Sequence, residues 1–240
     1  MSCNIDVVIL CGGKGTRMNG VGKSLPKPMV KIGGKPILWH VMKIYSYYGF
    51  NNLILCLGNK ANKIKEYFKD IRGWNITFAY TGLNTNTGGR IKKIEKYVNG
   101  ETFFATYADG LADIDLSELL EYHKRRGKIA TITVVKPRSP FGVVELDSSN
   151  LITSFIEKPV YDHWINGGFF VFNKDIFDYI GENDTLEREP FEKLVKNKEI
   201  CAYIHQGFWK CMDTYKDNLE LKEMWRTNEA RWAIWKKGER

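Results

Sequence analysis

Short apolar runs alternate with amphipathic segments along the first half of the chain. Four continuous apolar runs have the length of buried strands: residues 7–10, 53–57, 76–80 and 103–107. Between them, two segments carry apolar side chains at helical spacing: residues 36–48 and 61–68. Buried strands that alternate with amphipathic helices are typical of a largely parallel sheet with helices on both faces. The pattern therefore predicts an α/β fold.

The second half of the chain has shorter elements. A strand at residues 130–135 is followed, after Pro137, by a β-pair at residues 141–146 and 152–157. The remaining strands are expected at residues 169–172 and 200–205. Further helices are expected at residues 91–98, 116–126, 175–180, 189–196 and, as a tail, 219–240. No internal repeat or low-complexity linker interrupts the sequence, so we expect a single domain, residues 1–240.

The first apolar run leads directly into a glycine-rich loop with positive charges. Residues 12–17 read GGKGTR, and PKPM follows at residues 26–29. Backbone without side chains approaches a ligand closely, and its N–H groups can converge on an anion. Thr16 adds a hydroxyl donor, while Arg17 and Lys27 add fixed positive charge. The loop therefore suits an oligophosphate, and an ordinary strand and turn with incidental glycines is the alternative.

The loop matches neither of two common phosphate-binding motifs. Gly22-Lys23-Ser24 supplies the end of a P-loop, but the first glycine of that motif would fall on Arg17. A dinucleotide fingerprint that starts at Gly13 would need its third glycine at Met18. The phosphate-binding hypothesis therefore depends on the GGKGTR and PKPM pair.

Two carboxylates are candidates for a metal site. Asp109 follows the buried strand 103–107, and an acid at the carboxyl end of a central strand is well placed for Mg²⁺. Asp213 lies among aromatic residues and needs a partner, which a metal shared with Asp109 would provide. Asp113 and Asp115 precede the helix 116–126 and are expected to be cap or turn residues.

Two further polar segments are candidates for binding. Residues 81–90 form a polar loop whose glycines and hydroxyls are suited to reading the edge of a flat base, and a plain loop capped by Thr87 is the alternative. Glu157, Lys158 and Asn166 form a polar set suited to sugar hydroxyls and a phosphate, and solvated turn chemistry is the alternative. The four histidines show no ligand spacing and are expected to pack or to lie on the surface.

Composition and charge narrow the class of protein. The net charge of +8 is compatible with nucleic acid, anionic membranes or anionic small molecules, and a solvated basic surface is expected for most lysines. The chain has no polybasic block and no aromatic RNA motif, which argues against nucleic acid. No apolar run is long enough to span a bilayer, and the N-terminus does not look like a signal peptide. The five cysteines form no CxxC pair, which indicates free thiols in a reducing cytoplasm and argues against zinc.

The tail is rich in tryptophan and ends in a basic cluster. We expect it to pack on the body of the protein or on a second subunit. An interfacial membrane helix is the alternative.

Eight motifs together resemble the glucose-1-phosphate cytidylyltransferase family. The first two, GGKGTR and PKPMV (residues 26–30), mark the wider sugar-phosphate nucleotidylyltransferase superfamily. The others point to the cytidylyltransferase branch: GKPILWH (34–40), TGGR (87–90), EKP (157–159), WINGGFF (164–170), EREP (187–190), and GFW followed by MDT (207–214). The resemblance covers nearly the whole chain.

The resemblance implies a Rossmann-like nucleotidyltransferase fold: a mixed, mostly parallel sheet, a small β-rich sugar-binding subdomain and a C-terminal helix. It divides the domain into a nucleotide-binding part (1–136), an acceptor-binding part (137–215) and a C-terminal helix (216–240). It implies an enzyme that transfers CMP from CTP to a sugar 1-phosphate, most simply glucose 1-phosphate, in the cytoplasm and with Mg²⁺. A homo-oligomer without nucleic-acid or membrane partners is expected.

The resemblance also assigns residues. Catalysis would fall to Arg17, Lys27 and Asp109, and Mg²⁺ to Asp109 and Asp213. CTP would contact Leu10, Cys11, Gly12, Gly13, Lys14, Gly15, Thr16, Arg17, Lys27, Gly82, Thr87, Gly88, Tyr107 and Ala108. The acceptor would contact Gly142, Glu157, Lys158, Asn166 and Gly167.

One departure from the family pattern leaves alternatives open. The segment at residues 70–74 is shorter than in the family, where a longer segment helps to assemble subunits around the nucleotide. The oligomer and the acceptor are therefore open, and a different phosphorylated sugar, polyol or small molecule is an alternative substrate. A non-catalytic sugar-nucleotide sensor is a second alternative, although the presence of both Asp109 and Asp213 favours an enzyme.

Overall fold

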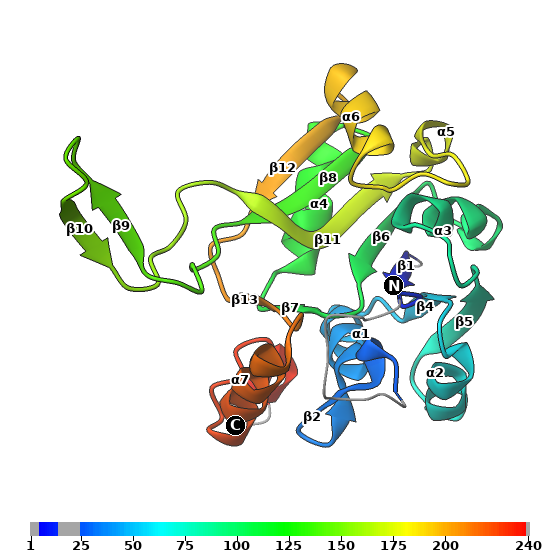
Figure 1. Cartoon of the computed structure of the whole chain (residues 1–240). Coiled ribbons are helices and arrows are strands. Elements are labelled where there is room, and N and C mark those ends of the chain that lie inside the picture. The colour runs from blue at the N-terminus through cyan, green and yellow to red at the C-terminus, as the bar shows by residue number, and fades with distance from the viewer. Residues whose placement is uncertain (1–4, 14–24, 239–240) are drawn as a thin grey trace.

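A seven-stranded mixed sheet forms the centre of the computed structural model, which describes residues 5–13 and 25–238 (Figure 1). The strand order is β12–β8–β11–β6–β1–β4–β5. The strands are β1 (Asp6–Leu10), β4 (Asn52–Leu57), β5 (Asn75–Tyr80), β6 (Thr102–Tyr107), β8 (Ala130–Val135), β11 (Ile165–Asn173) and β12 (Ile200–Ile204). Only β11 runs antiparallel to its two neighbours, β6 and β8. The predicted mixed, mostly parallel sheet is confirmed.

Helices cover both faces of this sheet. One core cluster takes in α1 (Ile37–Tyr47), α2 (Ala61–Phe68), α4 (Leu116–Arg126) and α7 (Tyr215–Arg226). The other takes in α3 (Thr87–Lys93), α5 (Ile176–Tyr179) and α6 (Glu189–Lys196). Successive residues of β1 enter opposite clusters, because side chains alternate across a strand: Val7 and Ile9 face the first, and Val8 and Leu10 the second.

Most predicted elements have the expected bounds. Helices α2, α4 and α6 and strand β8 coincide with their predicted ranges. The Asp115 carboxylate accepts hydrogen bonds from Ser117 N and Glu118 N, both at 2.9 Å, so its prediction as a cap is confirmed. The remaining short elements are β2 (Lys31–Ile32), β3 (Lys35–Pro36), β7 (Gly110–Ala112), β13 (Trp209–Cys211) and the 3₁₀ turns η1 (Lys27–Met29), η2 (Glu95–Tyr97) and η3 (Ile234–Gly238).

Two helix predictions were wrong in extent. Helix α3 begins at Thr87 rather than at residue 91, so Gly88 and Gly89 lie in its first turn. Glycine has low helix propensity, and only the close approach of Asp184 O and Glu182 O explains glycine there. The tail is not one helix over residues 219–240: α7 starts earlier, behind a capping box at Thr214, and ends at Arg226.

The segment after α7 packs on the body of the protein. This is one of the two packing arrangements expected for the tail, the other being a second subunit. Trp232 is fully buried, and its ring lies 6.2 Å from that of His40 on α1. Trp225 of α7 and Trp235 of the following segment also border His40, with ring centroids at 4.9 and 6.1 Å. Among the described residues, no helix has the length and apolar character needed to cross a membrane.

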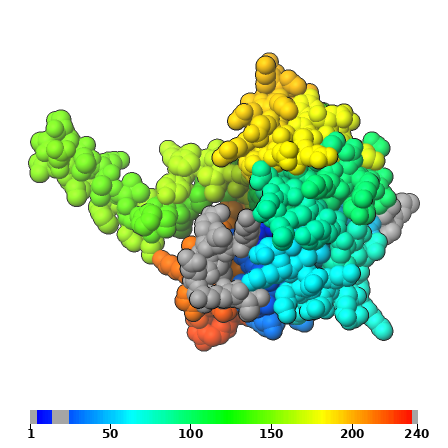
Figure 2. Space-filling model, turned by 45° about the vertical axis from the view of Figure 1, so that its right-hand side comes forward, coloured from blue at the N-terminus to red at the C-terminus, as the bar shows by residue number. Residues whose placement is uncertain are grey.

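A hairpin of β9 (Val143–Leu146) and β10 (Ile152–Ile156) projects from the body as an arm (Figures 1 and 2). The predicted β-pair is therefore confirmed. Its large apolar side chains are exposed: Phe141 is 72% exposed, and Leu151 and Phe155 are each 65% exposed. We call residues 141–156 the arm.

Candidate active site

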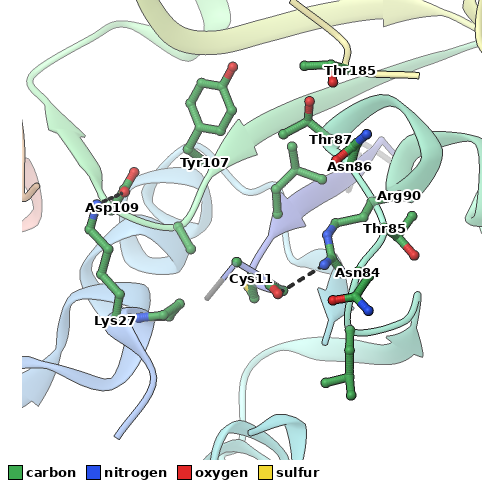
Figure 3. A pocket seen from close by; sticks show the side chains of 16 residues that line it. Cys11, Lys27, Asn84, Thr85, Asn86, Thr87, Arg90, Tyr107, Asp109 and Thr185 are labelled. Atoms are coloured by element: carbon green, nitrogen blue, oxygen red, sulfur yellow. Dashed lines mark hydrogen bonds and ion pairs between the residues drawn. The ribbon is translucent and has the colours of Figure 1, made fainter. Parts of the chain in front are cut away.

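A pocket of about 640 Å³ opens at the carboxyl ends of β1 and β6 (Figure 3). These strands are parallel neighbours, so the segments that follow them emerge at the same edge of the sheet. The lining residues are Leu10, Cys11, Gly12, Gly13, Lys27, Pro28, Leu83, Asn84, Thr85, Asn86, Thr87, Arg90, Tyr107, Ala108, Asp109 and Thr185. Gly12 and Gly13, at the start of the glycine loop, and Asp109, which the sequence analysis treated separately, therefore face one cavity.

Arg90 holds the start of the glycine loop in place. Its guanidinium donates to Gly12 O at 3.0 Å, and also to Thr81 Oγ1 at 2.6 Å and Gly82 O at 2.9 Å. The side chain is buried, and a Cβ on Gly12 would lie 2.0 Å from Arg90 Nη1. A side chain at position 12 would therefore displace the Arg90 guanidinium from these acceptors, and Arg90 acts as a support of the pocket wall.

At the opposite end of the pocket, Lys27 lies between two acids. Its Nζ is 2.5 Å from Asp109 Oδ2 and 2.5 Å from Asp213 Oδ1. Burial alone would lower the pKa of Lys27, but the two carboxylates outweigh it and raise that pKa, so the ammonium stays charged. We call Lys27, Asp109 and Asp213 the charged cluster.

Backbone contacts between distant segments assemble the charged cluster. Lys27 is in the 3₁₀ turn η1, where Pro28 fixes the backbone. Asp109 is between β6 and β7, and β7 pairs antiparallel with β13, which ends two residues before Asp213. Met212 N donates to Asp109 O at 3.0 Å. The two predicted metal-binding acids therefore meet at one point, and the thiol of Cys211 lies with them: donor atoms of all three residues are within 4.8 Å of one another.

A hydrogen-bonded set orients Tyr107 beside the charged cluster. The Tyr107 hydroxyl donates to Glu187, and Thr87 Oγ1 donates to the same carboxylate at 2.6 Å. Asn166 Nδ2 donates to Tyr107 Oη at 3.4 Å. Burial and the neighbouring Glu187 raise the pKa of Tyr107, so its hydroxyl remains protonated. Thr87 is therefore tied to the pocket wall, and Asn86 takes the cap position that the sequence had offered to Thr87.

The structure brings many of the predicted nucleotide-binding residues together. Those that line the pocket are Leu10, Cys11, Gly12, Gly13, Lys27, Thr87, Tyr107 and Ala108. Gly82 and Gly88 do not line it: Gly82 O accepts from Arg90, and Gly88 packs against Asp184 O. Lys14, Gly15, Thr16 and Arg17 lie outside the described residues.

Sequence reasoning missed several lining residues. Leu83, Asn84, Thr85 and Asn86 belong to the loop that was expected to read a base, but they were not chosen individually. Thr185 comes from the connection between α5 and α6, nearly 100 residues further along the chain, and nothing in its local sequence signals a site.

The predicted acceptor-binding residues separate into two groups. Asn166 and Gly167 belong to β11: Asn166 Nδ2 donates to Tyr107 Oη of the pocket, and Gly167 O accepts from Trp209 Nε1 at 2.7 Å. Gly142 belongs to the arm, where a Cβ would meet the Phe155 ring. Glu157 and Lys158 directly follow the arm and pair with each other at 3.7 Å. None of the five predicted acceptor-binding residues lines the pocket itself.

Comparison with known proteins identifies relatives over nearly the whole chain. The profile of the family "Nucleotidyl transferase" matches residues 6–225. A "probable glucose-1-phosphate cytidylyltransferase" of Bacillus subtilis is 45% identical, over 95% of this chain and 99% of its own length. The glucose-1-phosphate cytidylyltransferase of Salmonella typhi is 42% identical, over 95% of this chain and 98% of its own length.

Among solved structures, HddC from Yersinia pseudotuberculosis has a TM-score of 0.74 at 26% identity, over 92% of this chain and 99% of its own. That protein has also been solved in complex with GMP-PN. The alignment with the Bacillus subtilis protein runs over 252 positions, more than the 240 residues of this chain. The relative therefore has residues that this chain lacks.

Proposed function

The chain belongs to the nucleotidyl transferase family, and from this premise we propose that it transfers CMP from CTP to glucose 1-phosphate, releasing pyrophosphate. The observation that carries the proposal is the charged cluster at one end of a pocket whose other wall includes Gly12, Gly13 and residues 83–87. Backbone amides and cations suit a triphosphate, and the polar loop suits a base and ribose. The names of the two relatives supply CTP and glucose 1-phosphate as substrates.

The proposal includes Mg²⁺ at Asp109 and Asp213. Mg²⁺ prefers oxygen ligands and is commonly held by one or two carboxylates together with substrate phosphates. The Lys27 ammonium between the two acids marks a point that favours a cation, so the residues fit the ion. When bound, the ion would neutralise negative charge on phosphate oxygens.

The chemical step is a direct displacement at the α-phosphorus of CTP. A phosphate oxygen of glucose 1-phosphate forms the new P–O bond. The bond from the α-phosphorus to the oxygen that bridges to the β-phosphorus breaks, and its electron pair leaves with pyrophosphate. Lys27 offsets charge on the phosphates, while Arg90 and the Tyr107–Glu187–Thr87 set hold the pocket walls in position. No protein nucleophile is needed for this step.

The proposal also includes the assembly state and the compartment: a homo-oligomer formed through the arm, located in the cytoplasm. An isolated two-stranded hairpin is marginally stable in water, yet the arm exposes Phe141, Leu151 and Phe155. Several large exposed apolar side chains on one element commonly mark an interface, and a second copy of this chain would cover them. The free thiols of Cys201 and Cys211 suit a reducing compartment.

A screen of pyrophosphate release tests the substrates. Purified protein with Mg²⁺ is given each of CTP, UTP, dTTP and GTP, crossed with glucose 1-phosphate and a panel of other sugar and polyol phosphates. We expect the fastest release with CTP and glucose 1-phosphate. Release with CTP but a different acceptor would replace glucose 1-phosphate in the proposal, and no release with any pair would favour the sensor over the enzyme.

A further inference from the structure

The thiol of Cys211 lies beside the charged cluster, and the proposed reaction assigns it no role. Cys211 is the last residue of β13 and pairs with Gly110 of β7, beside Asp109. Side chains alternate along extended backbone, so Cys211 and Asp213 leave the same face. Met212 between them is fully buried in the core. The alternation therefore directs one thiol and one carboxylate from a single short segment toward Asp109.

The two carboxylates alone suit Mg²⁺, but together with the Cys211 thiol they suit a different class of metal ion. Thiolate ligands favour Zn²⁺ and similar soft ions, whereas Mg²⁺ binds oxygen. Two carboxylates and one thiolate are three protein ligands, the number found in open zinc sites that leave the fourth position to water or substrate. We propose that Asp109, Cys211 and Asp213 together bind a thiophilic divalent cation such as Zn²⁺, in competition with the Mg²⁺ of the reaction.

Local sequence spacing conceals this donor set. The sequence analysis argued against zinc because no two cysteines are spaced as a CxxC pair. The set contains one cysteine only, and its first carboxylate comes from a segment about 100 residues earlier, brought there by the pairing of β7 with β13. A thiophilic ion at this position would engage both carboxylates that hold Lys27 and would therefore inhibit CMP transfer.

Optical titration with Co²⁺ is the direct test, because a thiolate–Co²⁺ bond produces a charge-transfer absorption band that carboxylates do not. The full chain is titrated without nucleotide, as wild type, Cys211→Ser and Cys201→Ser. Cys201 is a matched control, since it is also a partly exposed free thiol but lies on β12 beside Thr131. We expect the band in wild type and Cys201→Ser, and its loss in Cys211→Ser.

Calorimetric titration with Zn²⁺ gives the size of the effect. Loss of one ligand from a three-ligand set should weaken Zn²⁺ binding by at least about 10- to 100-fold in Cys211→Ser, while Cys201→Ser binds as wild type does. A band that persists in Cys211→Ser, or an equal Zn²⁺ affinity in the three proteins, would overturn the proposal.

Protection from alkylation tests the proposal in unaltered protein, in case Cys211→Ser does not fold. Iodoacetamide modification of each cysteine is followed by mass spectrometry with and without Zn²⁺. We expect Zn²⁺ to slow modification of Cys211 and to leave Cys201 unchanged, and equal rates at Cys211 would contradict the proposal. The inference rests on the metal centre of the proposed function, but these readouts need neither CTP nor turnover. Failure of the substrate screen and failure of the thiol ligand are therefore separate results.

Discussion

Two basic side chains, the largely buried Lys27 and the fully buried His40, have different charge states at pH 7. Lys27 lies in the charged cluster, with a side chain 14% exposed, and His40 lies on α1 against the C-terminal segment, fully buried. The carboxylates keep Lys27 charged by raising its pKa against the effect of burial. Burial lowers the pKa of His40 to about 4, so its imidazole is neutral at pH 7.

The partners of the two groups explain their different uses. Lys27 is held by acids that a divalent ion can also bind, so its contacts can be exchanged. His40 Nε2 donates to Ile32 O at 2.9 Å, and its Nδ1 accepts from Trp232 Nε1 at 3.3 Å, which leaves no free position on the ring. Exchangeable charged partners suit a reaction site, and a closed set of neutral partners suits an anchor.

The largest effect is expected from breaking the anchor. Trp232→Ala removes a fully buried ring and the donor to His40. The free energy of unfolding should fall by about 3–5 kcal/mol, as measured by urea denaturation. Trp164→Ala is the control, because Trp164 is 43% exposed and should cost less than about 1 kcal/mol. Equal losses in the two variants would contradict the anchor.

A substitution in the charged cluster should have the opposite effect: it should lower the rate of reaction and leave the stability of the fold nearly unchanged. Lys27→Ala should lower the rate of pyrophosphate release by about 10²- to 10³-fold, because a cation beside the reacting phosphates is lost. Its urea midpoint should stay near that of wild type, since Mg²⁺ can neutralise both acids. Lys31→Ala, at an exposed lysine, is the control and should keep full activity. Near-normal turnover of Lys27→Ala would refute the role of Lys27.

A change of pH should separate the two groups without a mutation. The pKa of His40 is about 4 in the folded protein and about 6.5 in the unfolded chain, so below pH 6.5 the unfolded chain takes up the proton first and is favoured. The contribution of His40 to the free energy of unfolding should therefore fall by about 2 kcal/mol between pH 7 and pH 5, and by about 3 kcal/mol between pH 7 and pH 4. Burial lowers the pKa of His123 as well, which adds to the same trend.

The control for this pH effect is His40→Gln, which cannot titrate. Denaturation curves at pH 7 and pH 5 should differ less in this variant than in wild type. The same difference in both proteins would assign the pH effect to other groups.

The smallest effect on stability is expected from the arm, which lies outside both regions and has exposed apolar side chains. Phe155→Ser should change the free energy of unfolding by less than about 0.5 kcal/mol, because the ring is 65% exposed. Sedimentation should nevertheless show a smaller assembly, since the proposed oligomer uses the arm. An unchanged assembly would place the interface elsewhere.

Much of the fold could be predicted because its signals are local. The alternation of residues 7–10, 53–57 and 76–80 with helices α1 and α2 is a property of short windows, and the structure confirms these elements. The start of α3 could not be predicted in this way. Gly88 and Gly89 disfavour a helix locally. They are needed because the carbonyl oxygens of residues 182 and 184 leave no room for a Cβ at these positions. Thr185 joins the pocket for the same non-local reason.

By itself, the sequence determined the α/β class, the glycine loop and the identity of the acids at positions 109 and 213, since each depends on residue type and nearby spacing. Only the tertiary structure decided that Lys27 bridges those acids, that Cys211 joins them and that His40 is neutral. These properties depend on burial and on distances between residues that lie up to 192 positions apart in the sequence. Both are set by strand pairing and core packing, which a local pattern does not contain.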